Sequence, residues 1–307
     1  MSASQPNMEV TVAGIRMKNP VTVASGTFGY GPEYADLVDL NGLGAIVVKG
    51  ISSQPWGGND TPRMVEVPGG LVNAIGLQNP GFEGFVREYM PFLRQLQTPL
   101  IVNIWGRTTE DYADIAARFS DVEGVSGLEV NISCPNIKEG GVAFGTDLKM
   151  AAEVIGAVRA HTPLPIIAKL SPNVSSIAPF ARLAEENGAN ALSLINSYPA
   201  MVIDIETRRP VLAHKTGGLS GPAIHPIAVK LVYEAARAVK IPVIGMGGIT
   251  SAKEALEFII AGATAVAVGT ANFTDPGTAL AVVRGIREYL VKHGIAAVTD
   301  LVGTLRT

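Results

Sequence analysis

Short runs of apolar residues alternate with longer segments of helical periodicity along the whole chain. Most of these runs are almost continuously hydrophobic, which is typical of parallel strands that are covered on both faces. The runs predict eight strands, at residues 21–25, 45–49, 100–105, 127–133, 165–171, 191–197, 242–247 and 265–270. Eight strand-then-helix units predict an α/β fold, a closed (β/α)8 TIM barrel rather than an open sheet.

The helical segments between these strands have recognisable ends. Ser251 and Glu254 form a capping-box pattern that opens a helix, and Gly262 ends it. A second helix over 176–187 ends in the same way at Gly188. No linker or low-complexity tract divides the chain, so we expect one domain over residues 1–307.

Three segments are longer than a barrel needs. Residues 9–15 predict a small hairpin at the bottom of the barrel, and 63–77 predict an inserted extended pair after the second strand. Residues 198–222 follow the sixth strand and are too long for a bare connection. The last two follow carboxyl ends of strands, the face on which barrel enzymes build active sites.

The composition of the chain excludes several classes of partner and location. The chain is 47% hydrophobic with a net charge of −3 and contains no basic tract, so we expect no nucleic-acid partner. The first residues lack the features of a signal peptide, and the apolar runs are far too short to span a membrane. One free cysteine suits a reducing compartment. We therefore expect a cytoplasmic protein without a membrane partner.

Five consecutive strands end in an amide or an amine, which a hydrophobic barrel tolerates only where such groups find partners. These residues are Lys49, Asn103, Asn131, Lys169 and Asn196, with Gly50 and Ser197 beside them. Asparagine offers both a carbonyl acceptor and N–H donors, which suits the edge of a pyrimidine or a flavin ring. The two lysines would stabilise a reduced flavin or a substrate carboxylate. The set predicts a site for a flat, polar ligand.

Glycines follow the last two strands. Gly247 and Gly248 come after the seventh, and Gly269 and Thr270 end the eighth. In barrels these loops commonly bind phosphate through backbone N–H groups. Thr250 stands where a dinucleotide fingerprint needs its third glycine, so the pattern favours a mononucleotide such as FMN over NAD.

Cys134 is the candidate acid or base, because a thiol exchanges protons readily near neutral pH. The alternative for a lone cysteine is a buried small hydrophobe. Residues 73–77 could hold an anion or a ring edge, although a plain hairpin explains that stretch equally well. The histidines show no spacing for a metal site or a triad, and we expect no metal.

Three motifs together resemble the class 1 dihydroorotate dehydrogenases. They are Asn131-Ile-Ser-Cys134-Pro-Asn136, Asn73-Ala-Ile-Gly-Leu77 and Lys215-Thr-Gly-Gly-Leu-Ser-Gly221. The resemblance covers essentially the whole chain. It implies that FMN lies on the carboxyl rim of the barrel and that dihydroorotate stacks against it. Cys134 would take the C5 proton while the C6 hydride passes to flavin N5.

The resemblance also implies the residues of both sites. FMN would be held by Ala24, Ser25, Lys49, Gly50, Asn103, Asn131, Lys169, Ile195, Gly221, Gly247, Gly248, Gly269 and Thr270. Dihydroorotate would be held by Lys49, Asn73, Ala74, Ile75, Gly76, Leu77, Asn131, Asn196 and Ser197. Lys49 is also expected to act in catalysis. Ser197 stands where the family often has threonine, and it keeps the hydroxyl.

The subtype that the motifs resemble is class 1B, whose catalytic subunit passes electrons to NAD through a partner subunit. One cysteine cannot hold an iron–sulfur cluster. We therefore expect FAD and a 2Fe–2S cluster on a partner, and a heterotetramer built on a homodimer of this chain. The alternative is a class 1A homodimer that reduces fumarate. A membrane quinone enzyme is disfavoured, because those use serine as the base.

Three rival functions remain open on the sequence. The uracil-reducing domain of dihydropyrimidine dehydrogenase resembles this barrel and also uses a cysteine. A flavin-free sugar-phosphate isomerase or aldolase would use Lys169 as a Schiff base and would be colourless. A regulatory barrel would bind a ligand without turnover, which Cys134 and the two rim lysines argue against.

Overall fold

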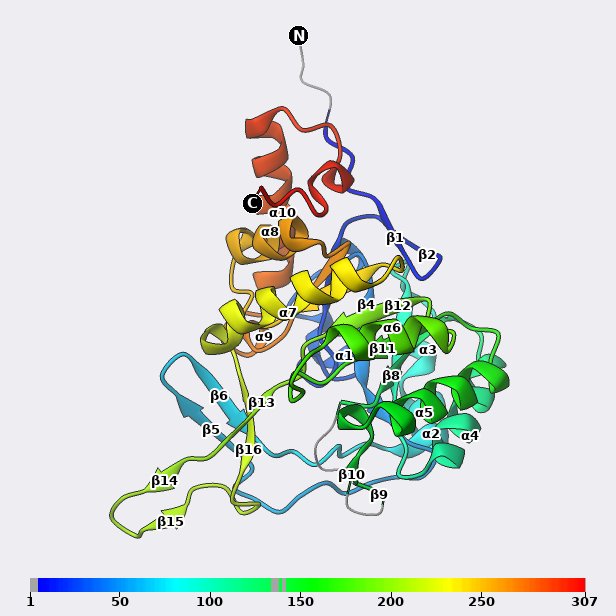
Figure 1. Cartoon of the computed structure of the whole chain (residues 1–307), viewed down its shortest axis with the longest axis vertical. Helices are drawn as coiled ribbons and strands as arrows, with labels where there is room; N and C mark the ends of the chain where they lie inside the picture. Colours follow the sequence, from blue (N-terminus) through cyan, green and yellow to red (C-terminus); the bar gives the residue numbers. More distant parts are fainter. Residues whose placement is uncertain (1–4, 134–137, 140–141, 307) are drawn as a thin grey trace.

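Eight parallel strands form one sheet in the computed structural model, which describes residues 5–133, 138–139 and 142–306 (Figure 1). The neighbours follow chain order around the sheet. They are β3 (Val21–Val23), β4 (Ile46–Ile51), β7 (Leu100–Ile104), β8 (Val125–Asn131), β11 (Ile166–Lys169), β12 (Ala191–Leu194), β17 (Val243–Met246) and β18 (Ala265–Val268). The predicted strands therefore all form, and the (β/α)8 barrel is confirmed.

The first and second barrel strands meet at a narrow seam. Thr22 and Ala45 form a parallel bridge there, and the fully buried Thr22 hydroxyl donates to the Ala45 carbonyl oxygen at 2.8 Å. The Gly44 backbone N–H donates to the Val21 carbonyl oxygen at 2.8 Å. A buried strand edge would leave unpaired backbone groups, which these contacts avoid by joining the two ends of the sheet.

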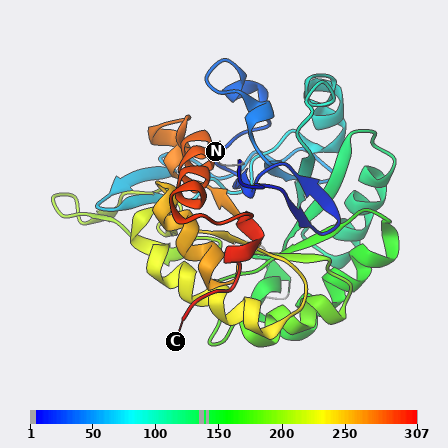
Figure 2. The same ribbon diagram turned by 90° about the horizontal axis from the view of Figure 1, so that it is seen from above.

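Helices follow the strands and cover the outside of the barrel (Figure 2). The longer ones are α2 (Gly81–Glu88), α4 (Thr109–Ser120), α5 (Leu148–His161), α6 (Ala178–Glu186), α7 (His225–Ala238), α8 (Ala252–Ala261) and α10 (Thr278–His293). The short ones are α1 (Pro32–Ala35), α3 (Met90–Leu93) and α9 (Ala271–Thr274), with 3-10 turns at Leu40–Gly42, Phe144–Thr146, Pro222–Ile224 and Val298–Leu301. No helix in the described ranges is both long and apolar enough to cross a membrane.

The predicted cap of α8 is confirmed. The Ser251 side chain accepts from the helix backbone, and the Glu254 carboxylate accepts from the Ser251 backbone N–H at 2.8 Å. Gly262 ends the helix with φ at 127°, a conformation that a side chain would strain. The cap satisfies N–H groups that the first turn of a helix leaves unpaired.

The predicted hairpin near the start of the chain consists of β1 (Val10–Val12) and β2 (Ile15–Met17). Its inward side chains are buried in the same core as the barrel strands. A Cβ added at Gly127, near the start of β8, would lie 2.9 Å from Cδ1 of Ile15. The hairpin therefore lies against the amino-terminal end of the barrel, as expected.

The two long inserts pair with each other in one antiparallel sheet, which the sequence did not reveal. Residues 63–77 supply β5 (Met64–Val67) and β6 (Gly70–Asn73), the predicted extended pair. Residues 198–222 supply β13 (Tyr198–Ala200) and β16 (Gly217–Ser220), and β16 pairs with β6. The strand order is β13-β16-β6-β5. Val72, Ala74 and Leu212 form a small hydrophobic core of their own.

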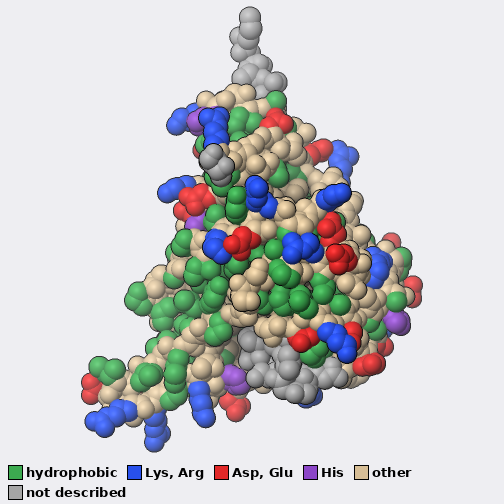
Figure 3. All heavy atoms as spheres, viewed as in Figure 1, with side chains coloured by type: hydrophobic (Ala, Val, Ile, Leu, Met, Phe, Trp, Pro, Cys, Tyr) green, Lys and Arg blue, Asp and Glu red, His purple; other side chains and the backbone are tan. Residues whose placement is uncertain are grey.

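Between β13 and β16 the chain forms a projecting hairpin of β14 (Ile203–Asp204) and β15 (Arg209–Pro210). Hydrophobic and basic side chains are visible together on this projection (Figure 3). Ile205, at its turn, is 80% exposed. After β8 the described pieces are β9 (Lys138–Glu139) and β10 (Val142–Ala143), which pair antiparallel. Cys134 lies outside the described residues.

Candidate active site

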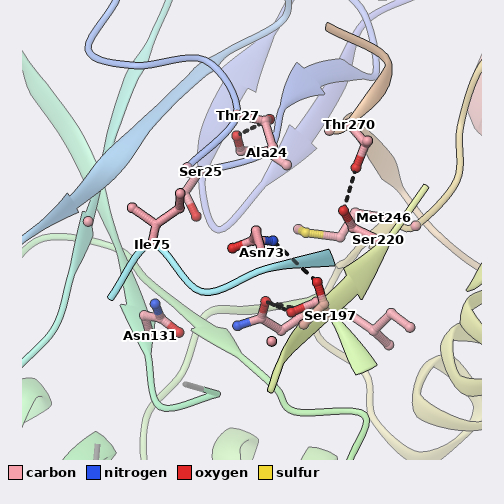
Figure 4. Close-up of a pocket in the computed structure, with 18 of the residues that line it drawn as sticks. Ala24, Ser25, Thr27, Asn73, Ile75, Asn131, Ser197, Ser220, Met246 and Thr270 are labelled. Atoms are coloured by element: carbon pink, nitrogen blue, oxygen red, sulfur yellow. Dashed lines mark hydrogen bonds between the residues drawn. The ribbon is translucent and has the colours of Figure 1, made fainter. Parts of the chain in front are cut away.

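A cavity of about 590 Å³ opens at the carboxyl ends of the barrel strands, beneath the antiparallel sheet of the two inserts (Figure 4). Each of the eight barrel strands contributes to its wall, either from its last residues or from the residue directly after it. These residues are Ala24, Lys49, Asn103, Asn131, Lys169, Ile195, Met246 and Ala267. The parallel sheet therefore delivers one side chain per strand to a single hollow.

The cavity contains every predicted site residue except Cys134. From the barrel it is lined by Ala24, Ser25, Lys49, Gly50, Asn103, Asn131, Lys169, Ile195, Asn196, Ser197, Gly247, Gly248, Gly269 and Thr270. From the inserts it is lined by Asn73, Ala74, Ile75, Gly76, Leu77 and Gly221. Residues 73–77 thus form part of the cavity wall.

Other lining residues were not predicted. They include Gly26, Thr27, His214, Thr216, Gly217, Gly218, Ser220 and Met246. Thr216, Gly217, Gly218 and Ser220 lie inside the motif 215–221, so motif membership was the available signal for these four residues. His214 was assigned no role on the sequence, because spacing along the chain does not show which histidine a long insert brings to the rim.

A buried carboxylate underlies the polar wall. Glu129 on β8 is 1% exposed and accepts from Asn103 Nδ2 and Ser193 Oγ, each at 2.7 Å. Lys169 Nζ lies 3.7 Å from Glu129 Oε1 and donates to Ser25 Oγ at 2.9 Å. Glu129 was not predicted from the sequence. An acid inside the apolar run 127–133 was the signal that could have found it.

Glu129 fixes which atoms Asn103 offers to the cavity. A carboxylate can only accept hydrogen bonds, so the amide nitrogen of Asn103 faces it. The Asn103 Oδ1 atom is buried and has no hydrogen-bond partner among the described residues. A buried acceptor left unpaired costs about 1–3 kcal/mol. The wall at Asn103 therefore fits a ligand that brings an N–H donor.

The opposite polarity holds at Asn131 and Asn196. Asn131 Oδ1 accepts from the Ser133 hydroxyl at 2.8 Å, and Asn196 Oδ1 accepts from the Ser197 backbone N–H at 2.8 Å. Asn196 Nδ2 donates to the Ser133 hydroxyl at 2.9 Å. Because both oxygens are engaged within the protein, the amide N–H groups of Asn131 and the second N–H of Asn196 are the groups that a ligand can accept from. This part of the wall suits carbonyl or carboxylate oxygens.

Lys49 carries the second amine of the cavity. Burial lowers the pKa of Lys49 below its ordinary value, and the positive charge of Arg63 lowers it further, while Glu33 acts in the opposite direction. A lysine whose positive charge is destabilised in this way gains more from an anionic ligand than an exposed lysine does. Lys49 therefore suits a substrate carboxylate.

Glycine backbone forms the end of the cavity near β17 and β18. Gly247 and Gly248 have φ values of 137° and 67°. A Cβ at Gly247 would lie 2.7 Å from the Cβ of Ala228, and one at Gly248 would lie 2.8 Å from the carbonyl oxygen of Gly221. Thr270 Oγ1 donates to Ser220 Oγ at 2.8 Å beside them. Close backbone approach near the start of α7 is the arrangement that binds phosphate.

His225, at the start of α7, supports this glycine end. Its Nδ1 lies 3.0 Å from the Gly247 carbonyl oxygen, and its Nε2 lies 2.8 Å from a carboxylate oxygen of Glu257. The carbonyl that precedes Gly248 is thereby held by a side chain from a different element. Among the described residues no group of three or more His, Cys, Asp or Glu side chains could hold a metal ion.

Comparison with known proteins agrees with this geometry. The family described as Dihydroorotate dehydrogenase matches residues 7–290. A curated protein of Geotalea uraniireducens, named dihydroorotate dehydrogenase B (NAD(+)), catalytic subunit, is 55% identical over 99% of both chains. Proteins with the same name from Citrifermentans bemidjiense and Lachnoclostridium phytofermentans are each 54% identical over 98% of this chain, and over 99% and 100% of their own length.

The family matches over almost the whole barrel, and these relatives align from end to end. The resemblance found in the motifs of the sequence is therefore confirmed, including its subtype. The chain belongs to the dihydroorotate dehydrogenase family, and within it to the group of the B-type catalytic subunits.

Proposed function

We propose that this chain oxidises dihydroorotate to orotate in pyrimidine (UMP) biosynthesis, with FMN bound in the cavity and NAD as the final acceptor. The observation that carries the proposal is the composition of one cavity wall. An unpaired acceptor, a set of amide donors, two lysines and a glycine cradle all face the same hollow. The names of the relatives agree with this activity.

The residues of the cavity fit FMN. Its volume of about 590 Å³ falls within the range of about 300–1,000 Å³ that is usual for cofactor sites. The acceptor at Asn103 suits a ring N–H, and the glycine end at 247–248 suits a phosphate. Lys169 and Ser25 would lie against the ring. Gly221, Gly269 and Thr270 would complete the phosphate end. When bound, FMN supplies the two-electron acceptor for the hydride that leaves C6 of the substrate.

Dihydroorotate would lie against the donor side of the wall. The amide N–H groups of Asn131 and the second N–H of Asn196 would bind its carbonyl oxygens, and the Ser197 hydroxyl would orient the ring. Lys49 and the backbone of residues 73–77 would hold the carboxylate. These contacts fix the substrate in one orientation in the cavity. Fixed orientation replaces a costly bimolecular encounter with a unimolecular step.

Cys134 is proposed as the base. In this role its thiolate removes the C5 proton of dihydroorotate as the C6 hydride leaves. The proton ends on the sulfur and must pass to solvent before the next turnover. The place of Asn131, three residues before Cys134, supports this proposal, because Asn131 lines the cavity at the carboxyl end of β8.

The further path of the electrons requires a partner. We propose that a subunit carrying FAD and a 2Fe–2S cluster accepts them from this chain and reduces NAD, in a heterotetramer built on a homodimer of this chain. The relatives are named catalytic subunits of an NAD(+) enzyme, which supports a partner. A cytoplasmic location fits a soluble substrate and NAD.

Substitution of Lys49 tests the substrate site. Because the pKa of Lys49 is lowered, its positive charge is full below that pKa and is lost as the pH rises through it, at a lower pH than for an ordinary lysine. The dissociation constant of orotate, measured by perturbation of the flavin spectrum, should rise over that pH range. Lys49→Met should weaken binding about tenfold or more, as expected for a charged hydrogen bond, and should remove this pH dependence.

The matched control is Lys18→Met, a change of an exposed lysine before the first barrel strand. It should bind orotate with the affinity and the pH profile of the parent protein. If Lys49→Met has the same pH profile as the parent, another group holds the carboxylate.

Substitution of Cys134 tests the base. Cys134→Ala should leave FMN bound and lower the rate of flavin reduction by dihydroorotate by about 10²–10⁴-fold, the usual contribution of a general base. Cys134→Ser should keep a small activity that increases with pH, because a hydroxyl is a poorer base at neutral pH. Stopped-flow absorbance measures both rates. Normal flavin reduction in Cys134→Ala would remove this residue from the mechanism.

An acceptor screen tests the subtype. The chain should reduce an artificial dye alone, and should reduce NAD only when it is co-expressed with an iron–sulfur flavoprotein partner. The rate of orotate formation measures both reactions. Rapid reduction of fumarate by the chain alone would support the self-sufficient class 1A enzyme and contradict the B-type assignment.

A further inference from the structure

We propose that Glu129 is a positioning residue of the cofactor site, which holds Lys169 and Asn103 in place and compensates the charge of Lys169. The proposal rests on the proposed function, because it assigns Glu129 to the ring end of the FMN site. Glu129 itself is not among the residues that line the cavity. It acts through two neighbours that do.

Glu129, on β8, contacts residues from three other barrel strands. Its carboxylate receives Asn103 from β7, Lys169 from β11 and Ser193 from β12. The Lys169 amine extends the network to Ser25, which follows β3. Ser193 is fully buried, and Glu129 and Lys169 have side-chain exposures of 1% and 5%. The network therefore spans the inside of the barrel just below the cavity.

Such a network is costly as a purely structural device. Two charges removed from water lose solvation that their attraction only partly returns, and well-packed hydrophobic residues often replace such a pair without loss of stability. Apart from Lys169 and Ser193, the residues of β11 and β12 are apolar and buried, so a hydrophobic substitute would suit this position. What the pair adds is a fixed orientation of two groups in the cavity wall, the Oδ1 atom of Asn103 and the amine of Lys169.

The first consequence concerns Asn103. While Glu129 is a carboxylate, the Asn103 amide nitrogen faces it and the Oδ1 atom is left for the ligand. An uncharged amide at position 129 could donate as well as accept, so Asn103 could turn its side chain by half a rotation. The Asn103 side chain would then offer the ligand either its oxygen or its amide N–H groups, whereas in the structure it offers the oxygen.

The second consequence concerns charge. Lys169 and Glu129 together are neutral, so the cavity receives an amine donor with a compensating negative charge 3.7 Å behind it. Without Glu129 the positive charge of Lys169 is uncompensated in a region of low dielectric constant. Lys169 would then stabilise a negatively charged reduced flavin more strongly than it does while Glu129 offsets its charge. The neutral oxidised flavin would be affected less. Glu129 therefore keeps the reduction potential of the site lower than Lys169 alone would set it.

The test is Glu129→Gln in the FMN-loaded chain, with the dissociation constants of oxidised and reduced FMN as the readout. Their ratio should shift in favour of reduced FMN by about tenfold or more, which equals a positive shift of about 30 mV for a two-electron couple. The control is Ser193→Ala, which removes one hydrogen bond to the same carboxylate and leaves its charge. Its ratio should stay within about threefold of the parent, or about 15 mV.

An unchanged ratio in Glu129→Gln would overturn the proposal. An equal shift in Ser193→Ala would also overturn it, because a general loss of packing would then explain both results. A shift in Glu129→Gln alone supports it.

Urea unfolding of the FMN-free chain tests the pairing itself and does not depend on activity. Glu129→Gln leaves the Lys169 charge buried and uncompensated, so its unfolding midpoint should fall. The double variant Glu129→Gln/Lys169→Met removes both charges and should unfold at a higher urea concentration than the single variant. If the single variant does not fold, recovery of folded protein in the double variant is the expected result. A double variant no more stable than the single one would overturn the pairing.

The two experiments separate this proposal from the proposed function. Failure of the parent chain to bind FMN would contradict the function and leave the unfolding result for the Glu129–Lys169 pair as it stands. Normal FMN binding by the parent together with an unchanged ratio in Glu129→Gln would contradict the role of Glu129 alone.

Discussion

The closed parallel sheet is the constraint on which the rest of the molecule depends. Strands covered on both faces cannot leave backbone N–H and C=O groups unpaired, so the sheet joins its own ends at the Thr22–Ala45 seam. Parallel strands in such a ring all end at the same rim. Every side chain near the end of a strand is therefore brought close to the ends of the others, although these residues are far apart in the sequence.

The position of a residue along its barrel strand decides whether it packs in the core or lines the cavity. Most residues inside the strands are apolar and buried, and polar groups gather at the last positions, where a ligand and the insert sheet can satisfy them. Glu129 is a charged residue that departs from this pattern, because it lies two residues deeper than Asn131 on the same strand. Its hydrogen bonds to Asn103 and Ser193 and its pairing with Lys169 make that depth tolerable.

The sequence predicted the barrel well because each strand and helix is encoded locally. The hydrophobic runs located all eight strands to within a few residues, and the cap at Ser251 and Glu254 was readable as it stands. The same periodicity placed Lys49, Asn103 and Lys169 at one rim. The rest of the wall came from motifs shared with a family, whose residues line the cavity while their individual roles stay predictions.

What the sequence did not show depends on contacts between distant segments. The pairing of β6 with β16 joins residues such as Asn73 and Gly218, and no local pattern specifies such a partner. The acid in an apolar run could have drawn attention to Glu129, but it does not show which strands face that residue. His214 reached the cavity through the fold of a long insert. In each case the information lies in the tertiary arrangement rather than in the spacing of residues.

The most direct measurement is an anaerobic titration of the purified chain with dihydroorotate, which follows flavin absorbance and orotate formation together. The purified protein should be yellow, and its flavin band should be bleached as one orotate forms for each FMN. A colourless protein, or a flavin band that dihydroorotate leaves unchanged, would contradict the proposed function.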